Sequence, residues 1–417
     1  MRESNVSANL AKLKLILGCL FIIMLVFSKF ATSSCIILFI LLAFYNIFFP
    51  NGHWTPLNAK AEFKAFFQQP VFWALTLVFW IIVFGYFNSE NVSYWLSRVR
   101  LRLPFLALPV VFFLYPWNKN EKDKILLFSI GLIFLVSTGV VINYIINYET
   151  MSQLIKTGSS IPVPMKDHVR YAQLEAFVFL GGIYWLINNP EKTWVRKVVF
   201  IMASLIFIYL HILAVRTGIL IAYAGLVCFF LLYLRKLNIK QIILIVFTAA
   251  IIPFVAIKTI PTLKSKLDYA TWEWSMFIKG QHLNNSDSGR WISYEVGLGY
   301  FKSNPLFGIG PGDLEDEMVK TYHDKYPDVK VRKQPHNQFL HTLACSGILG
   351  LIAFLIAFFI PLFIAIKTDN KILVVLLVAT FASFMVESPL ETARGTALIA
   401  FWLGIFISKK EINYKTS

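Results

Sequence analysis

Residues 198–234 read VVFIMASLIFIYLHILAVRTGILIAYAGLVCFFLLYL, which is two apolar blocks, 198–215 and 217–234, with Arg216 between them. A membrane-spanning helix needs roughly 20 mostly apolar residues, so each block has about the length of one span. Similar blocks recur at 13–28, 30–49, 71–87, 103–117, 125–146, 171–188, 241–259, 339–366, 372–388 and 395–408. The pattern predicts an all-α polytopic membrane protein with about twelve transmembrane helices.

The composition agrees with this class. Of the 417 residues, 57% are hydrophobic and 15% are charged, which leaves more apolar surface than a soluble domain of this length buries. The net charge of +16 does not indicate a nucleic-acid partner, because the Lys and Arg residues are scattered between apolar blocks. It fits membrane topology and anionic lipids as partners. The four cysteines lie inside apolar blocks and form no disulfide or zinc pattern, and no metal or cofactor is expected.

The positive charges also predict the topology. With a cytoplasmic N-terminus, the loops predicted on the inner side carry most of the lysines, and both termini are cytoplasmic. Arginines on the predicted outer side break this rule, and they are Arg98, Arg100, Arg102, Arg216 and Arg394. They suggest that an anionic ligand binds there. For the run from Arg98 to Arg102 the alternative is an interfacial helix, with Tyr94 and Trp95 at headgroup depth.

The blocks divide the chain into three predicted parts. Residues 1–259 hold helices 1–9, residues 260–338 form one large outer loop domain, and residues 339–417 hold helices 10–12. In the loop, residues 284–289 have turn chemistry, and residues 291–301 have apolar residues at helical spacing. A second helix is predicted from Asp313 to Tyr322, capped by Asp313.

Two arginines are the candidate anion-binding residues. Arg216 lies at or just inside the outer membrane face, where an arginine is costly and usually binds something, although it could be a snorkelling residue that marks a helix end. Arg290 precedes the predicted helix 291–301, so its guanidinium and the free N–H groups of that helix could bind the same anion. Alternatively, Arg290 anchors the loop to a carboxylate. Two guanidinium groups on the outer side, each of which can donate two hydrogen bonds in parallel, suit a diphosphate.

His336 is the candidate general base. It follows Pro335, which disfavours helix at the residue before it, and it precedes Asn337 and the long apolar helix, so it should lie at or near a helix start. There the helix macrodipole favours neutral imidazole, which can take a proton from a sugar hydroxyl. The alternative is a structural histidine that caps the helix. Several carboxylates could orient such a base, but the sequence selects none of them. They are Glu387 and Glu391 between the last two blocks, and Asp287, Glu295 and Asp313 in the loop.

These residues resemble a known family. Arg290-Trp291, the stretch Asn304-Pro305-Leu306-Phe307-Gly308-Ile309-Gly310 and the stretch Pro335-His336-Asn337-Gln338 are similar to the domain shared by O-antigen ligases and O-antigen polymerases. Bacterial protein O-oligosaccharyltransferases also contain this domain. The resemblance covers residues 198–360 directly.

The resemblance implies a GT-C type fold in the bacterial inner membrane, with the loop domain and the active site on the periplasmic face. It implies a glycosyltransferase that moves a glycan from undecaprenyl diphosphate to an acceptor hydroxyl. Arg216 and Arg290 would hold the diphosphate and His336 would activate the acceptor, with Arg98, Arg102, Asn337 and Arg394 as further substrate-binding candidates.

An O-antigen ligase acting on lipid A–core is favoured, and an O-antigen polymerase is the alternative. From another class, a lipid-linked glycan transporter also has about twelve spans. Transporters usually place their polar groups at mid-membrane and contain internal repeats, whereas the polar groups here gather on one face.

Overall fold

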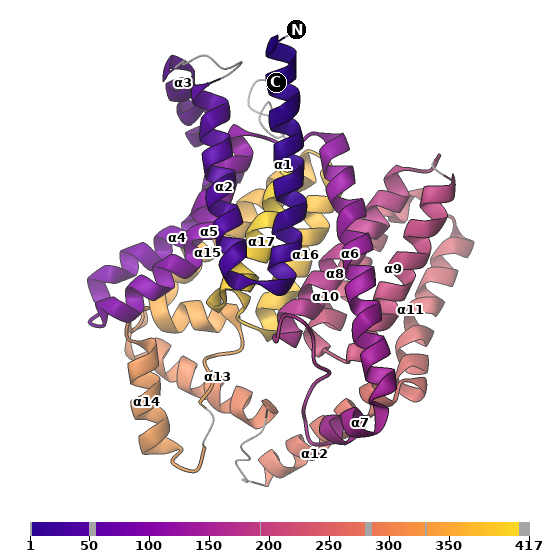
Figure 1. The fold of residues 1–417 in the computed structure, drawn as a ribbon. Helices are drawn as coiled ribbons and strands as arrows, with labels where there is room; N and C mark the ends of the chain where they lie inside the picture. The colour runs from indigo at the N-terminus through magenta and orange to yellow at the C-terminus, as the bar shows by residue number, and fades with distance from the viewer. Residues whose placement is uncertain (1, 50–55, 192, 280–285, 330–331, 408–417) are drawn as a thin grey trace.

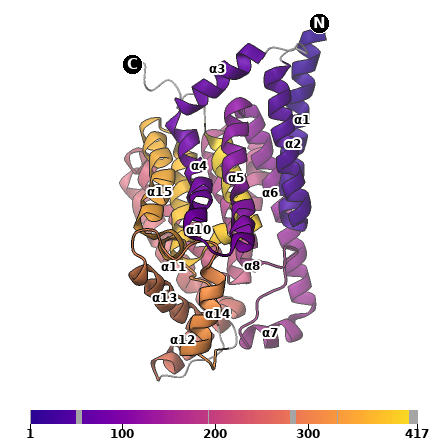
Figure 2. The same cartoon turned by 90° about the vertical axis from the view of Figure 1, so that its left-hand side faces the viewer.

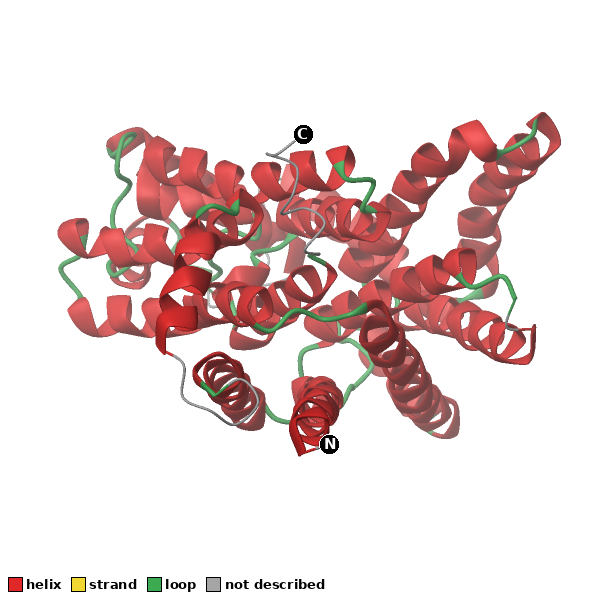
Figure 3. Cartoon of the chain, turned by 90° about the horizontal axis from the view of Figure 1, so that it is seen from above, coloured by secondary structure: helices red, strands yellow, loops and turns green. Residues whose placement is uncertain are grey.

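The computed structural model describes residues 2–49, 56–191, 193–279, 286–329 and 332–407. Within these residues the regular structure is entirely helical (Figure 3). The helices of the first part are α1 (Arg2–Phe27), α2 (Lys29–Phe48), α3 (Pro56–Phe67), α4 (Pro70–Phe84), η2 (Gly85–Asn88), α5 (Val92–Leu114), α6 (Lys119–Ile146), α7 (Tyr148–Lys156), α8 (His168–Asn188) and α9 (Thr193–Leu213). The remainder are α10 (Arg216–Tyr233), η3 (Leu234–Lys236), α11 (Ile239–Thr259), α12 (Pro261–Ile278), α13 (Ser286–Ser303), α14 (Leu314–Lys325), α15 (Gln338–Lys367), α16 (Lys371–Val386), η4 (Pro389–Glu391) and α17 (Ala393–Phe406).

Every apolar block falls in one helical segment to within a few residues, although α1 and α5 each begin 11 residues before their blocks at 13–28 and 103–117. Among the described helices, eight are long and apolar enough to cross a membrane, and these are α1, α2, α4 with η2, α6, α9, α10 with η3, α11 and α15. The apolar helices α16 and α17 are shorter, and α5 carries the arginine run in its first half. The chain is therefore an all-helical protein with several candidate spans, and the number twelve stays a prediction.

The helices form a broad bundle with a small helical layer at one end (Figures 1 and 2). Helix α4 packs between α5 and α15, and α10 packs between α8 and α16. Helices α12, α13 and α14 lie at the end opposite the start of α1 (Figure 1), and α12 packs against α7. The predicted outer loop thus contains three helices in the described residues, all on one side of the bundle.

Close packing of two helix starts fixes one wall of the site. Gly218 in the first turn of α10 lies so near α8 that a Cβ there would be 2.6 Å from the Cβ of Ala172. Only a glycine permits this approach. Because α8 begins at His168 and α10 at Arg216, the packing brings the polar starts of both helices together.

The stretch Asn304–Gly310 docks into a kink in α15. Gly347 departs from helical geometry (φ 60°, ψ −163°), which exposes backbone groups on both sides of the kink. The Ile309 and Gly310 N–H groups donate to the carbonyls of Ala344 and Cys345 (3.0 Å each), and Ile348 N–H donates to Pro305 (2.9 Å). Gly308 adopts φ 71°, and a Cβ there would lie 2.4 Å from the Cys345 carbonyl carbon. The motif is therefore a backbone joint between the loop and the bundle.

Two details of the loop prediction differ from the structure. Asp313 is the N-cap residue of α14, as predicted, but its side chain makes no capping hydrogen bond. Its carboxylate instead accepts hydrogen bonds from the backbone N–H groups of Glu90 (2.9 Å) and Asn91 (2.8 Å). These residues directly precede α5, so the carboxylate ties the loop to the bundle. Residues 286–289, predicted as a turn, are the first turn of α13. Residues 284 and 285 lie outside the described residues.

Candidate active site

The site is organised around the carboxylate of Glu387, which ends α16. Arg290 Nη2 lies 2.8 Å from its Oε1, His336 Nδ1 lies 3.2 Å from its Oε2, and Arg170 Nη2 lies 3.7 Å from Oε2. Arg290 comes from α13, Arg170 from α8, and His336 from the segment that leads into α15. One buried carboxylate thus gathers three cationic or potentially cationic groups from separate parts of the chain.

The position of His336 is set by the start of α15. Asn337 is the N-cap residue; its Oδ1 accepts from Leu340 N–H at 3.0 Å and its Nδ2 donates to the carbonyl of Met385 at 2.9 Å. The backbone carbonyl of His336 accepts from the hydroxyl of Tyr294 at 3.0 Å. The prediction that His336 lies at a helix start is confirmed, and it precedes the cap. Asn337, rather than His336, is the capping residue.

The charges around Glu387 and His336 determine where this pair carries its proton. Burial opposes ionisation of Glu387, but the hydrogen bond from His336 and the charges of Arg170 and Arg290 outweigh it and lower its pKa from 4.5 to about 2. An ionised carboxylate only accepts hydrogen bonds, so Nδ1 of His336 carries the proton. In a neutral imidazole, Nε2 is then the basic nitrogen. The His336 side chain is 26% exposed, so a bound molecule can reach it.

Arg290 also lines a cavity of about 210 Å³ together with Arg216, His168, Lys266 and Tyr269. Arg216 is the first residue of α10 and follows Ala214, whose left-handed backbone (φ 50°) makes the tight turn from α9. No side chain caps this start of α10, so the positive end of its macrodipole adds to the cationic lining. The structure therefore brings the two predicted arginines, Arg216 and Arg290, to one cavity.

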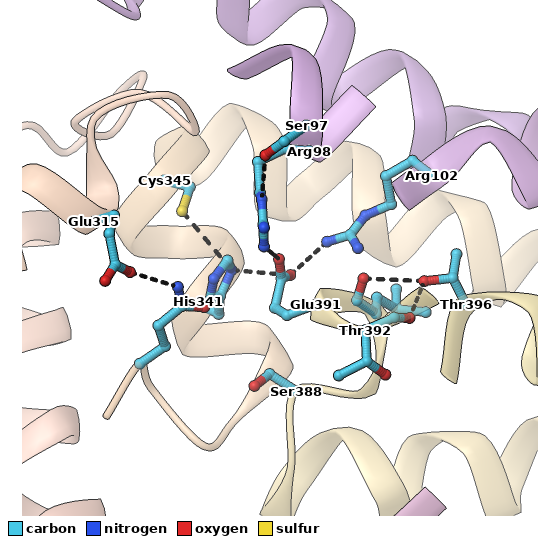
Figure 4. Close-up of polar contacts among 12 residues, drawn as sticks. Ser97, Arg98, Arg102, Glu315, His341, Cys345, Ser388, Glu391, Thr392 and Thr396 are labelled. Atoms are coloured by element: carbon cyan, nitrogen blue, oxygen red, sulfur yellow. Dashed lines mark hydrogen bonds and ion pairs between the residues drawn. The ribbon is translucent and has the colours of Figure 1, made fainter. Parts of the chain in front are cut away.

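Glu391, one turn beyond Glu387, forms a second carboxylate centre (Figure 4). Arg102 forms a short ion pair with it, Arg98 Nη1 lies 3.7 Å from its Oε2, and His341 Nδ1 lies 3.2 Å from its Oε1. Burial opposes ionisation, but Arg102, His341, a hydrogen bond from Gln338 and Arg98 lower the pKa of Glu391 to about 2. These contacts fasten α5 to the turn before α17.

Other predicted substrate-binding residues lie elsewhere. Arg98, Arg102, Asn337 and Arg394 are absent from the described lining of the 210 Å³ cavity. Arg102 is buried against Glu391, and Arg394 donates a short hydrogen bond to the Met165 carbonyl at a different cavity. Their role in binding substrate stays a prediction.

Sequence reasoning missed three residues of the site. His168 and Arg170 open α8, and Lys266 belongs to α12, where its Nζ donates to the Gly158 carbonyl at 2.8 Å. The signal for the first two was present, because they stand at the outer end of an apolar block as Arg216 does. Lys266 had no such signal. The sequence could not choose among the carboxylates offered as orienting partners of His336, and in the structure Glu387 is the one that contacts it.

Comparison with known proteins agrees with this geometry. Residues 198–355 match the sequence model of the family described as O-Antigen ligase. A protein of Haemophilus influenzae, described as uncharacterized, is 23% identical over 328 residues, which cover 76% of this chain and 77% of that protein. The matched range contains Arg216, Arg290 and His336. Residues 198–355 are therefore similar to the O-antigen ligase family. They lie in a chain whose described part has several helices long and apolar enough to cross a membrane.

Proposed function

We propose that this protein is a bacterial inner-membrane glycosyltransferase. It transfers a glycan en bloc from undecaprenyl diphosphate to a hydroxyl of lipid A–core, without a metal ion, in a GT-C type fold. The observation that carries the proposal is the double role of Arg290, which lines the cavity with Arg216 and also pairs with the carboxylate that holds His336. Arg290 therefore links the cations suited to the leaving diphosphate with the histidine suited to activate the attacking hydroxyl.

The mechanism follows from the charges. The acceptor oxygen attacks the anomeric carbon while Nε2 of His336 removes its proton. The bond between that carbon and the diphosphate oxygen breaks, and the leaving diphosphate takes the electron pair. Arg216 and Arg290 stabilise the negative charge that grows there, and Glu387 stabilises the imidazolium that forms. A single displacement inverts the anomeric configuration.

The proposed orientation has the loop helices on the periplasmic side and both termini in the cytoplasm. It is supported by lysine-rich loops at the opposite side of the membrane. Cations of the cavity lining, among them Lys266, add to the attraction for an anionic donor. The glycan itself would extend from the cavity toward His336.

The test is transfer by purified protein in proteoliposomes with undecaprenyl-diphosphate-glycan and lipid A–core. We expect His336→Ala to lower the transfer rate by about 100-fold or more while donor binding is kept, and Arg290→Ala to weaken both donor binding and transfer. His323→Ala is the matched control, because His323 is an exposed imidazole on α14 that pairs only with neighbouring Asp324 among the described residues.

The outcomes separate the alternatives. A glycan ladder on the carrier without a lipid A product would identify an O-antigen polymerase. Donor binding without either product, together with movement of the lipid-linked glycan across the bilayer, would identify the transporter. Full transfer by His336→Ala would contradict the proposed base.

A further inference from the structure

A groove of about 350 Å³ lies between α2, α5 and α17, which pack side by side (Figure 1). Its walls are mostly apolar along the length of these helices. They include Ile36, Ile40, Leu103, Ala107 and Ala397. One end of the groove is different, because the three cationic residues Lys29, Arg100 and Arg394 line it there. The groove is therefore amphipathic, with a long apolar part and a cationic end.

Arg394 is the residue that most strongly indicates a ligand in this groove. Its side chain is buried, with 6% of the residue exposed, and its Nε has no hydrogen-bond partner. Its Nη1 donates to a backbone carbonyl, that of Met165, and no ion pair with Arg394 is found among the described residues. The Asp167 carboxylate acts on Arg394 electrostatically but forms no ion pair with it. A buried charge without a paired counter-ion is costly, so an anion at this place would stabilise it.

Lys29 and Arg100 complete the cationic end. Both are exposed, and neither side chain forms an ion pair or hydrogen bond with the part of the chain that the structure describes. Lys29 is the first residue of α2, after the N-cap Ser28, so the positive end of that helix also faces this region. Three cations and a helix start thus surround a place that no described carboxylate neutralises within ion-pair distance.

A second cavity of about 450 Å³ adjoins the cationic end and shares Lys29 and Arg394 with the groove. Residues Met165 to His168 also line it, and His168 in turn lines the cavity of Arg216 and Arg290. The groove is separate from that cavity, but a continuous series of lining residues connects the two.

We propose that the groove binds one membrane lipid with a phosphorylated headgroup, its phosphate on Lys29, Arg100 and Arg394 and an acyl chain along α2, α5 and α17. The apolar wall distinguishes this occupant from a free phosphate, which needs no such wall. The cationic end distinguishes it from a zwitterionic lipid, whose net charge is zero. The binding site does not depend on the proposed transfer reaction.

The experiment is native mass spectrometry of the purified full-length protein titrated with phosphatidic acid, and with phosphatidylcholine as the neutral comparison. We expect one tightly bound phosphatidic acid in the wild type. The double variant Lys29→Gln/Arg100→Gln should weaken its binding about 25-fold, since each cation near a lipid surface contributes about fivefold. Ala107→Phe fills the apolar part of the groove and should also reduce binding, with all cations in place.

Two controls locate the site. Lys156→Gln removes an exposed cation from α7 and Arg290→Ala removes one from the other cavity; both should leave lipid binding unchanged. Unchanged binding in the double variant and in Ala107→Phe would overturn the proposal. Loss of lipid binding in Arg290→Ala alone would place the lipid in the other cavity. Displacement of the lipid by inorganic phosphate at equal concentration would show that the groove is only an anion site. Either result would also overturn the proposal.

Discussion

Replacing Glu387 with glutamine tests whether this carboxylate positions the proposed base. The side chain is 4% exposed and contacts His336, Arg290 and Arg170. Glutamine keeps the shape but removes the charge, and its amide can donate as well as accept, so Nδ1 of His336 is no longer held in the protonated form. We expect the turnover rate to fall about 100-fold, which corresponds to about 2.7 kcal/mol at the transition state.

Glu391→Gln is the matched control. Its carboxylate is also buried and also contacts two arginines and a histidine, so the loss of ion pairs and the effect on stability should be similar. Because Glu391 does not contact His336 in the described structure, turnover per folded molecule should change little. The assay is proteoliposome transfer with separate measurement of turnover and KM, normalised to protein that remains folded in a thermal unfolding scan.

The reasoning is refuted if Glu387→Gln retains wild-type turnover. It is also refuted if Glu391→Gln loses turnover to the same extent while folded.

Three further predictions follow from the contacts. Gly308→Ala should lower the free energy of unfolding, measured in a detergent unfolding scan, by at least about 2 kcal/mol, because Gly308 has a positive φ and lies close to Cys345. Gly299→Ala, where a Cβ meets nothing within 4 Å, should be neutral or stabilising in the same scan. The difference in the free energy of unfolding between wild type and Glu387→Gln, measured in the same scan, should be unchanged between about pH 7 and about pH 5. The pKa of Glu387 is lowered from 4.5 to about 2, so its stabilising ionised form is present above 4.5 and is lost only as the pH falls toward about 2. Transfer should survive chelation by EDTA, and a loss that added divalent metal restores would contradict the role given to Arg216 and Arg290.

The positions of the main polar residues could be predicted from the sequence because they depend on local rules. Arg216 interrupts two apolar blocks, so it must lie at a turn near the membrane face, and α10 does begin there. His336 precedes a long apolar run, and α15 begins two residues later. Periodicity also predicted a helix from 291 to 301, which lies inside α13.

The partners of these residues could not be predicted, because they come from distant parts of the chain. Nothing in the sequence distinguished Glu387 from Glu391, and the two carboxylates differ only in which arginines and histidine fold against them. Arg170 and Lys266 reach the site through helix packing and a loop contact. The contacts of the Asp313 side chain could not be predicted for the same reason, since the backbone N–H groups that it binds belong to residues 90 and 91.

The sequence by itself therefore determined that this chain is a helical membrane protein, which residues interrupt its apolar blocks, and which of them lie at helix starts. These properties follow from hydrophobicity and helix capping, which act over one or two turns. Only the tertiary structure decided that Arg290 joins the cavity of Arg216 to the Glu387–His336 pair, and that Arg394 is buried without an ion pair among the described residues. Contacts between side chains far apart in the chain depend on how whole helices pack. That packing cannot be predicted from the local sequence around each residue.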